Sequence, residues 1–338
     1  MAVPVTSREQ MGWWTRHERA LIPYLYIAPF FLLFLVFEIF PIGYSFWLSL
    51  FRGLGFGPKA FYGLGNYAHL FVDPRYVRAF WNTVYFTLAS IFVLSPLALL
   101  LALALQSILV RPRWRAFYRL IFFLPFVTSS VIVAVLWAVV LETKTGLLNQ
   151  LLGALGPLSG WQHDWLRDQH LALDIGGNTG ILGVPIIGDI IKASSIVWSA
   201  LFLINIWNFI GINSLYWTAG LNTVSPELYE AAAIDGASGW SKFWGITVPL
   251  LRPMTLFIVI QAIAGSFGVF ALPFLLTNGG PADATMTLSY YLYLQAFSIA
   301  NLGYANAIGY SMAIITLVLS LLNLWFFREE REPARAKA

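Results

Sequence analysis

The sequence predicts an all-α integral membrane protein that crosses the bilayer six times. Apolar residues make up 59% of the 338 residues and charged residues only 11%, and the mean hydropathy is +0.72. A soluble globular protein carries roughly 25% charged residues because water must solvate its surface. Most of this chain's surface therefore faces a medium other than water. The chain has no cysteine, which excludes disulfide scaffolds, cysteine-ligated metal sites and cysteine nucleophiles.

Six apolar runs are each long enough to span the hydrocarbon core, which takes about 20 residues of helix. The expected spans are 21–51, 79–110, 120–141, 193–221, 254–277 and 302–327. The first, second and fourth are longer than a bilayer requires, so these helices should tilt or bend. Pro41 and Pro96 are the expected bend points, because proline removes a backbone donor. The spans form a membrane domain over 21–327, between an N-terminal segment over 1–20 and a tail over 328–338.

The distribution of lysine and arginine predicts that both termini are cytoplasmic. Thirteen of the 20 basic residues lie in the N-terminal segment, the second and fourth connections and the tail, against seven in the first and third connections. Basic residues concentrate on the cytoplasmic side of membrane proteins. Their placement in short clusters between apolar runs also argues against nucleic-acid binding. Glu38 is the one ionisable residue well inside a span, which gives little support for ion-coupled transport.

The fourth connection, 222–253, has the sequence of two short helices joined by a glycine. Ser225 can cap the first helix, Pro226 suits its first position, and Glu227 favours the positive end of the helix dipole. Gly236 is the expected stop. Ser238 can cap a second helix, which Pro249 is expected to end. This connection lacks the lysines and arginines typical of a lipid-surface helix, so its composition favours docking of a cytoplasmic partner.

This connection resembles the EAA motif of permease subunits in ABC importers. The resemblance is carried by the segment from Glu230 to Ala237, with sequence EAAAIDGA, and by the later segment ITVPL from Ile246 to Leu250. Segments outside the loop resemble the carbohydrate-uptake branch of that family: Gly63 to Tyr67, Asp73-Pro74, Asn82-Thr83, Tyr118-Arg119 with Leu124-Pro125, and Leu276 to Pro281. Within this branch the chain is more similar to the F-type maltose permease than to the G-type.

The resemblance implies the six-helix transmembrane domain of a type I ABC importer in a bacterial or archaeal plasma membrane. Its implied partners are a second permease subunit, two ATP-binding cassette subunits and an extracytoplasmic sugar-binding protein. ATP and Mg²⁺ would be used by the ATPase subunits, with no cofactor bound by this chain. The sequence agrees, since none of its five lysines follows a glycine, as a phosphate-binding loop requires. The residues expected to couple the permease to the ATPase are Glu227, Glu230, Ala231, Ala232, Asp235, Gly236, Ala237 and Pro249.

A sugar site within a membrane needs amides and aromatic rings without net charge. Asn205, Asn208 and Ile212 are spaced to share one face of the fourth span, with Trp207 beside them. Asn205 matches a sugar-contacting asparagine of the maltose permeases by resemblance, and the fifth-span candidates follow from the same resemblance. The expected substrate-binding residues are Asn205, Trp207, Asn208, Ile212, Gln261, Gly265, Ser266 and Val269. Each polar residue has an alternative role in joining neighbouring helices.

The expected substrate is an oligosaccharide, a disaccharide or a related polyol. Glycerol 3-phosphate or a glycerol phosphodiester is the alternative, which would favour basic residues near the pathway. A membrane-embedded transferase is a third hypothesis, but the spans lack the paired carboxylates or histidines that it needs. The extended outer loop, 142–190, contains His163, Asp164, Asp168 and His170, whose spacing matches no metal-ligand pattern. No metal site is expected there.

Overall fold

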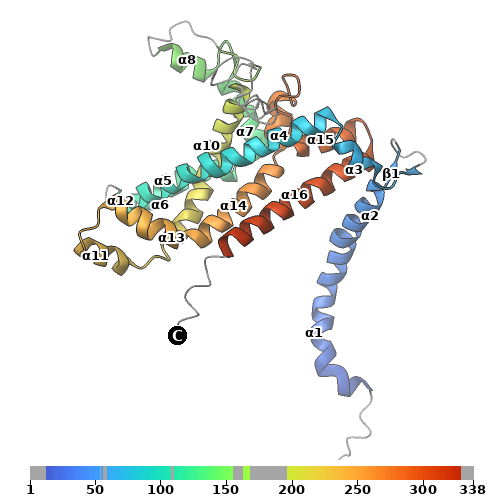
Figure 1. Ribbon diagram of the computed structural model, residues 1–338, viewed down its shortest axis with the longest axis horizontal. Coiled ribbons are helices and arrows are strands. Elements are labelled where there is room, and N and C mark those ends of the chain that lie inside the picture. The colour runs from blue at the N-terminus through green and yellow to red at the C-terminus, as the bar shows by residue number, and fades with distance from the viewer. Residues whose placement is uncertain are drawn as a thin grey trace, which may run out of the picture.

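The structure is a computed structural model that describes residues 13–53, 55, 59–107, 110–154, 163–167 and 196–328. It is a bundle of helices, from which one long helix at the N-terminal end diverges (Figure 1). Four helices in the described part are long and apolar enough to cross a membrane, and two bent helix pairs raise that number to six if each pair is one span. The candidate spans overlap all six apolar runs of the sequence, but the second bent pair, Gly239–Leu250 with Arg252–Phe267, begins within the fourth connection.

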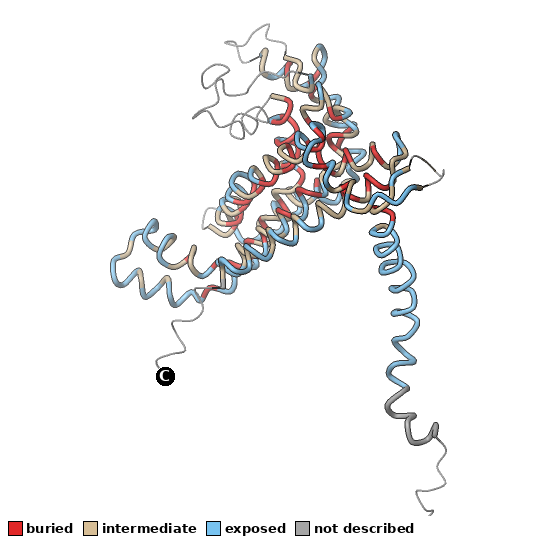
Figure 2. The backbone as a smooth tube through the Cα atoms, turned by 45° about the vertical axis from the view of Figure 1, so that its right-hand side comes forward, coloured by how far each residue is buried: buried red, intermediate tan, exposed pale blue. Residues whose placement is uncertain are grey.

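The first helical run contains α1 (Trp13–Phe34), the π-helical turn η2 (Leu35–Ile39) and α2 (Phe40–Ser49). It extends away from the bundle, and nearly all of its described side chains are exposed (Figure 2). Only the end of α2 is buried, at Leu48 and Ser49, next to the start of α16. A helix this apolar is not stable in water, so lipid or another protein must cover it.

A small outer segment follows α2. Strands β1 (Phe51–Arg52) and β2 (Ala60–Phe61) pair antiparallel, with Phe51 opposite Phe61, and α3 (Gly65–Leu70) comes next. Asn66 donates hydrogen bonds to the carbonyl oxygens of Ser49 and Phe51 at 2.8 and 2.9 Å. These bonds fix the turn between α2 and α3.

The second helical run contains α4 (Pro74–Ala89), η3 (Ser90–Leu94) and α5 (Ser95–Gln106). The π-helical turns η2 and η3 each end two residues before a proline, at Pro41 and Pro96. Proline cannot donate the next backbone hydrogen bond, and a π turn is a common local adjustment where the helical ladder is interrupted. The two expected bend points therefore coincide with a change of helix type rather than with a break in the helix.

The third expected span is divided in two. Helices α6 (Pro112–Val127) and α7 (Ser130–Val140) meet at 98°. Pro125 has no N–H to donate to the Ile121 carbonyl one turn earlier, and Thr128 and Ser129 have extended backbone angles. The helix thus begins eight residues before the predicted start at 120 and bends sharply inside the predicted range. The next elements are α8 (Leu147–Ala154) and α10 (Ile196–Leu221).

The fourth connection contains α11 (Pro226–Ile234), α12 (Gly239–Lys242), η5 (Phe243–Thr247) and α13 (Val248–Leu250). The two short helical segments are present, with Gly236 between them at φ +76°. One detail differs from the expectation, because the Ser225 side chain makes no capping hydrogen bond. Pro249 is the last residue but one of the continuous helical segment Gly239–Leu250, so the helix ends next to it.

The fifth expected span also ends earlier than predicted. Helix α14 (Arg252–Phe267) stops at Gly268, and the π-helical segment η6 (Pro273–Thr277) follows after a break. Two side-chain hydroxyls donate hydrogen bonds to backbone oxygens at this break. Ser289 donates to the Phe267 oxygen at 2.7 Å, and Thr287 donates to the Val269 oxygen at 2.6 Å. The chain continues through α15 (Leu288–Tyr293) and η7 (Leu294–Ser298), two segments the sequence did not predict, and ends in α16 (Leu302–Arg328).

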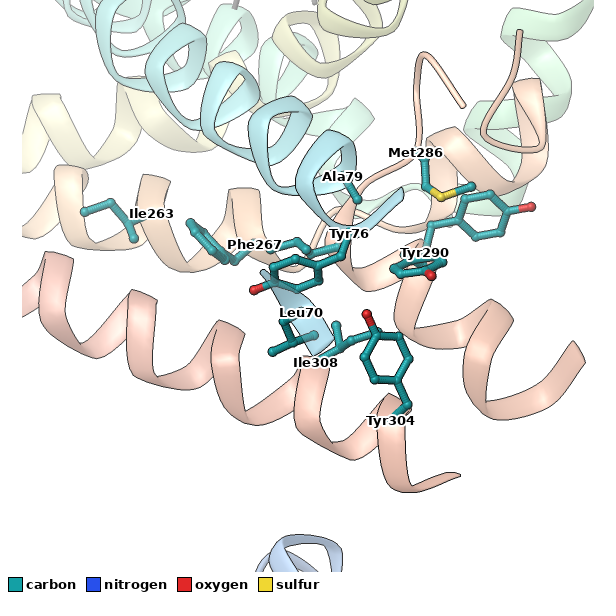
Figure 3. Packing of buried hydrophobic residues seen from close by; sticks show 11 residues of the cluster. Leu70, Tyr76, Ala79, Ile263, Phe267, Met286, Tyr290, Tyr304 and Ile308 are labelled. Carbon is teal, nitrogen blue, oxygen red and sulfur yellow. The ribbon is translucent and has the colours of Figure 1, made fainter. Parts of the chain in front are cut away.

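Three clusters of buried side chains hold the bundle together. One joins α3, α4, α14, α15 and α16 and contains Tyr76, Phe267, Tyr304 and Ile308 (Figure 3). A second surrounds the fully buried Trp198 of α10. The third joins α5, α10 and α14. Helix α10 belongs to the second and third clusters and is therefore a central element of the bundle.

The N-terminal ends of α4 and α16 meet α15 around one buried carboxylate. The hydroxyls of Tyr291 and Tyr304 donate to Asp73 Oδ2 at 2.7 and 2.5 Å, and the Arg75 backbone N–H donates to Oδ1 at 2.9 Å. Burial raises the pKa of Asp73, but these hydrogen bonds outweigh it and hold the pKa below the ordinary 3.8. Beside it, Arg75 makes a bidentate ion pair with Asp283, with both contacts at 2.8 Å.

Candidate functional site: a central polar cavity and a projecting helical elbow

A cavity of about 280 Å³ lies between the second, third, fourth and fifth helical runs. It is lined by Phe86, Ser90, Leu94, Phe126, Asn205, Phe209, Ile212, Asn213, Tyr216, Gln261, Ala262, Gly265, Ser266 and Val269. None of these described lining residues is charged. The lining combines amides and hydroxyls, which can pair with sugar hydroxyls, with aromatic rings, which can pack against the apolar faces of a sugar ring.

Six of the eight residues that the sequence predicted for substrate binding line this cavity: Asn205, Ile212, Gln261, Gly265, Ser266 and Val269. Asn205 is buried and Gln261 is exposed. Ser266 lies within hydrogen-bonding distance of Ser90, with 3.4 Å between the two hydroxyl oxygens. The structure therefore brings together residues from the fourth and fifth spans that are about 60 positions apart in the chain.

Trp207 and Asn208 are not part of the cavity lining. Successive residues of an α-helix are turned by about 100°, so Trp207 lies roughly 200° around α10 from Asn205. Its ring packs edge-on against Trp137 of α7 at 5.7 Å. Asn208 is 8% exposed, and its Oδ1 is enclosed without a hydrogen-bond partner in the described part of the protein. Trp207 thus lies on another face of α10, whereas Asn208, about 60° from Asn205 on the helix, shares its face but is not among the lining residues.

Several residues of the cavity were not predicted from the sequence. Asn213 and Tyr216 follow Asn205 by 8 and 11 positions, which places both within roughly 80° of it on α10. Helical periodicity continued one turn beyond Ile212 would have found them. Ser90 and Phe126 come from other helical runs, and no local pattern connects either residue with Asn205.

The elbow between α11 and α12 is built by a specific set of backbone hydrogen bonds. The N–H of Ala237 donates to the Ala232 oxygen at 2.8 Å, and the N–H of Gly236 donates to the Ala233 oxygen at 3.1 Å. This pair of bonds is the Schellman motif, which needs a residue with left-handed angles such as glycine. Ser238 accepts a hydrogen bond from the Ser241 N–H at 3.2 Å, as its predicted capping role requires. The hydroxyls of Tyr229 and Thr247 lie 2.8 Å apart and join the two arms of the elbow.

The elbow projects beyond the bundle and is largely uncovered (Figure 2). Of the residues predicted to couple to an ATPase, Glu227, Glu230, Ala231, Asp235 and Gly236 are exposed, and Ala232, Ala237 and Pro249 are half-buried. Ile234 is 87% exposed and Trp240 is 73% exposed. Large apolar side chains this accessible at the end of a projecting element are typical of a protein-binding surface.

In the outer loop, the structure describes α8 and residues 163–167. Asn149 is buried there and donates to the oxygens of Thr143 and His163, both at 2.9 Å, and it accepts a bond from Trp165. Asp168 and His170 lie outside the described residues. Within the described part, no group of three or more potential metal ligands is present.

Comparison with known proteins decides the family. Residues 94–328 match the family described as binding-protein-dependent transport system inner membrane component. The chain belongs to this family of permeases. This match confirms the expected recognition, because the family is the permease component of binding-protein-dependent ABC importers.

Individual relatives agree over nearly the whole chain. The permease is 37% identical to the probable ABC transporter permease protein YurN of Bacillus subtilis, over 94% of this chain and 99% of the relative. It is 35% identical to the arabinooligosaccharides transport system permease protein AraP of the same species, over 95% and 94%. It is 31% identical to the sn-glycerol-3-phosphate transport system permease protein UgpA of Agrobacterium fabrum, over 90% and 94%.

The fold agrees as well. A chain in the crystal structure of a bacterial ABC transporter involved in the import of the acidic polysaccharide alginate superposes with a TM-score of 0.72 at 25% identity, covering 94% of this chain and 99% of that one. The permease therefore has the type I importer fold that the sequence predicted. It is a permease subunit of an ABC importer and an inner membrane component.

Proposed function

We propose that this permease forms half of the translocation pathway for a neutral sugar, an oligosaccharide, disaccharide or related polyol, and that the cavity is its part of the sugar site. The uncharged lining of amides, hydroxyls and aromatic rings carries the proposal. Burying a charged substrate is costly unless an opposite charge pairs with it, and no lining residue could supply that charge.

Glycerol 3-phosphate is the second candidate, because the UgpA relative is named for its transport. A phosphate dianion favours arginine, lysine or a helix N-terminus at its site. The cavity lining contains neither arginine nor lysine, so the neutral sugar is favoured. A glycerol phosphodiester meets the same objection.

The pathway needs a second permease subunit to complete it. Gln261 and Gly265 line the cavity and are nevertheless exposed, so the cavity is open on the α14 side. The uncovered first helical run offers a second surface for that subunit. An extracytoplasmic sugar-binding protein would deliver the sugar, and both termini would lie in the cytoplasm as the basic residues indicate.

Two ATP-binding cassette subunits would supply the energy through the elbow of α11 and α12. This permease would have no catalytic site or bound cofactor, and the partner subunits would use ATP and Mg²⁺. Closure of the ATPase dimer would move the elbow, which is continuous with α10 and α14. These two helices carry nine of the fourteen residues around the cavity, so a rigid movement of the elbow can reshape the site.

The test uses the importer purified as a complex and reconstituted in vesicles. Uptake of labelled arabinooligosaccharide, lactose and glycerol 3-phosphate is measured together with ATP hydrolysis stimulated by the binding protein. Asn205→Ala and Gln261→Ala should reduce uptake of the transported sugar, because both lose amides that face the cavity. Stimulated hydrolysis should persist.

Asn208→Ala is the matched control, since it removes the same amide from the same helix outside the cavity. The control should transport like the wild type. Uptake of glycerol 3-phosphate but of no neutral sugar would overturn the substrate proposal. Equal uptake by wild type, Asn205→Ala and Gln261→Ala would remove the cavity from the pathway.

A further inference from the structure

Four arginines occupy the start of α6: Arg111, Arg113, Arg115 and Arg119. No aspartate or glutamate occurs between Asp73 and Glu142, so the whole of this helix and its neighbours in sequence lack a negative side chain. Within the described residues the one ion pair joins Arg75 to Asp283, far from this cluster in the chain. In the part of the chain that the structure describes, the charge of the cluster is therefore not neutralised by a carboxylate within ion-pair distance.

The position of these arginines on the helix increases the imbalance. The N-terminus of a helix carries a partial positive charge that favours acidic residues and disfavours basic ones. The first turn of α6 has no acidic residue, and Arg111 at the N-cap makes no side-chain capping bond. The general preference for basic residues on the cytoplasmic side explains which side of the membrane they occupy, but not their placement at the unfavourable end of a helix. An external anion would be attracted both by the arginine side chains and by the positive end of the helix dipole.

One arginine of the cluster serves the fold of this chain. Arg115 donates to the backbone oxygens of Gln106 and Ser107, each at 3.1 Å, and of Val110 at 3.2 Å. These bonds close the C-terminal end of α5. The other three remain available: Arg111 and Arg113 are exposed, and Arg119 is half-buried with an enclosed Nε that has no hydrogen-bond partner in the described part of the protein.

The side chains next to the arginines indicate what kind of anion fits. Trp114, Phe117 and Tyr118 are exposed at the same level of the helix, and the rings of Trp114 and Phe117 pack edge-on at 5.7 Å. Exposed Leu120, Ile121 and Leu124 follow one turn later. Arginines and aromatic side chains are interleaved over 111–119, and aliphatic side chains follow from Leu120. This pattern matches a membrane interface followed by the acyl layer, because long arginine side chains can reach back to the headgroups.

We propose that the start of α6 binds anionic phospholipid, with Arg111 and Arg119 on one side of the helix and Arg113 on the other at the level of the headgroup phosphates, and with Trp114 and Phe117 against the upper acyl chains. An acidic protein surface is disfavoured as the occupant, because the exposed aromatic and aliphatic side chains continue down the same helix. The elbow of α11 and α12 also projects beyond this end of the bundle (Figure 1). An anionic phospholipid can pair its phosphate with the arginines and cover the apolar side chains with its acyl chains.

The test measures lipid retained by the permease within its importer complex. The complex is purified in mild detergent with phosphatidylglycerol and phosphatidylcholine in equal amounts, and bound lipid is counted by native mass spectrometry. Each basic residue near a membrane surface favours anionic lipid by about fivefold. The double variant Arg111→Gln/Arg113→Gln should therefore lower the preference for phosphatidylglycerol by roughly 25-fold.

Three controls make the result specific. Arg111→Lys/Arg113→Lys keeps both charges and should retain most of the preference. Lys242→Gln removes a basic residue of the elbow and should leave it unchanged. Millimolar inorganic phosphate should not displace the lipid, since phosphate lacks acyl chains. Three results would each overturn the proposal. The preference for phosphatidylglycerol is unchanged in Arg111→Gln/Arg113→Gln, inorganic phosphate alone displaces the lipid, or the glutamine double variant loses the ATPase subunits while it retains the lipid.

Discussion

Replacing Gly236 by alanine tests the elbow with little risk to the rest of the protein. Gly236 has φ +76°, and a Cβ added there would meet no heavy atom within 4 Å. The effect of the substitution is therefore backbone strain without a clash. Left-handed angles cost an ordinary residue about 1–2 kcal/mol, which corresponds to roughly a 5- to 30-fold change in an equilibrium constant. If the elbow must hold this shape to bind the ATPase subunit, the affinity of the permease for that subunit should fall by the same factor.

The assay is the binding of purified ATPase subunit to the permease complex in nanodiscs. Gly236→Asn is the first control, because asparagine tolerates left-handed angles better than alanine and should bind nearly as well as glycine. Gly245→Ala is the second, since Gly245 lies inside η5 with equally open surroundings and no positive φ. Wild-type affinity for Gly236→Ala would refute the reasoning, and an equal loss in Gly236→Asn would refute backbone strain as its cause.

Two further predictions concern stability in detergent. A Cβ on Gly211 would lie 2.0 Å from the Phe122 oxygen, so Gly211→Ala should separate α6 from α10 and lower the free energy of unfolding by about 1–3 kcal/mol. Gly265→Ala is the control and should not lower it, because the added Cβ meets nothing within 4 Å. Equal melting temperatures for the two variants would contradict the close contact. Asp73→Ala should cost about 2–4 kcal/mol, because two buried tyrosine hydroxyls lose a charged acceptor. The pKa of Asp73 is lower in the folded protein than in the unfolded chain. Its contribution to the free energy of unfolding should therefore be present near neutral pH and lost as the pH falls below about 4. An equal difference in stability between wild type and variant at pH 7 and at pH 3 would contradict this.

Much of the architecture follows from the sequence because its causes are local. Apolar runs identify the helices that leave water, and Gly236 identifies a left-handed turn because only the backbone at that residue decides it. Ser238 likewise acts as a cap through atoms three residues away. Segments α15 and η7 were missed for the opposite reason. Together they cover only 288–298, too short to span a bilayer, and they are held by contacts to α4 and α16.

The residues of the candidate sugar site also divide into those that local periodicity identifies and those that only packing brings together. Periodicity on one helix correctly puts Asn205 and Ile212 together and, followed further, would have added Asn213 and Tyr216. It could not show that Ser90 and Phe126 meet that face. Which helix faces meet depends on how closely the helices approach and where they bend, as Gly211 does against Phe122 and Pro125 does between α6 and α7. The sequence by itself therefore determined the apolar runs, the glycine turn of the elbow and the family. The tertiary structure decided the composition of the cavity, because a cavity is defined by side chains that only packing brings together.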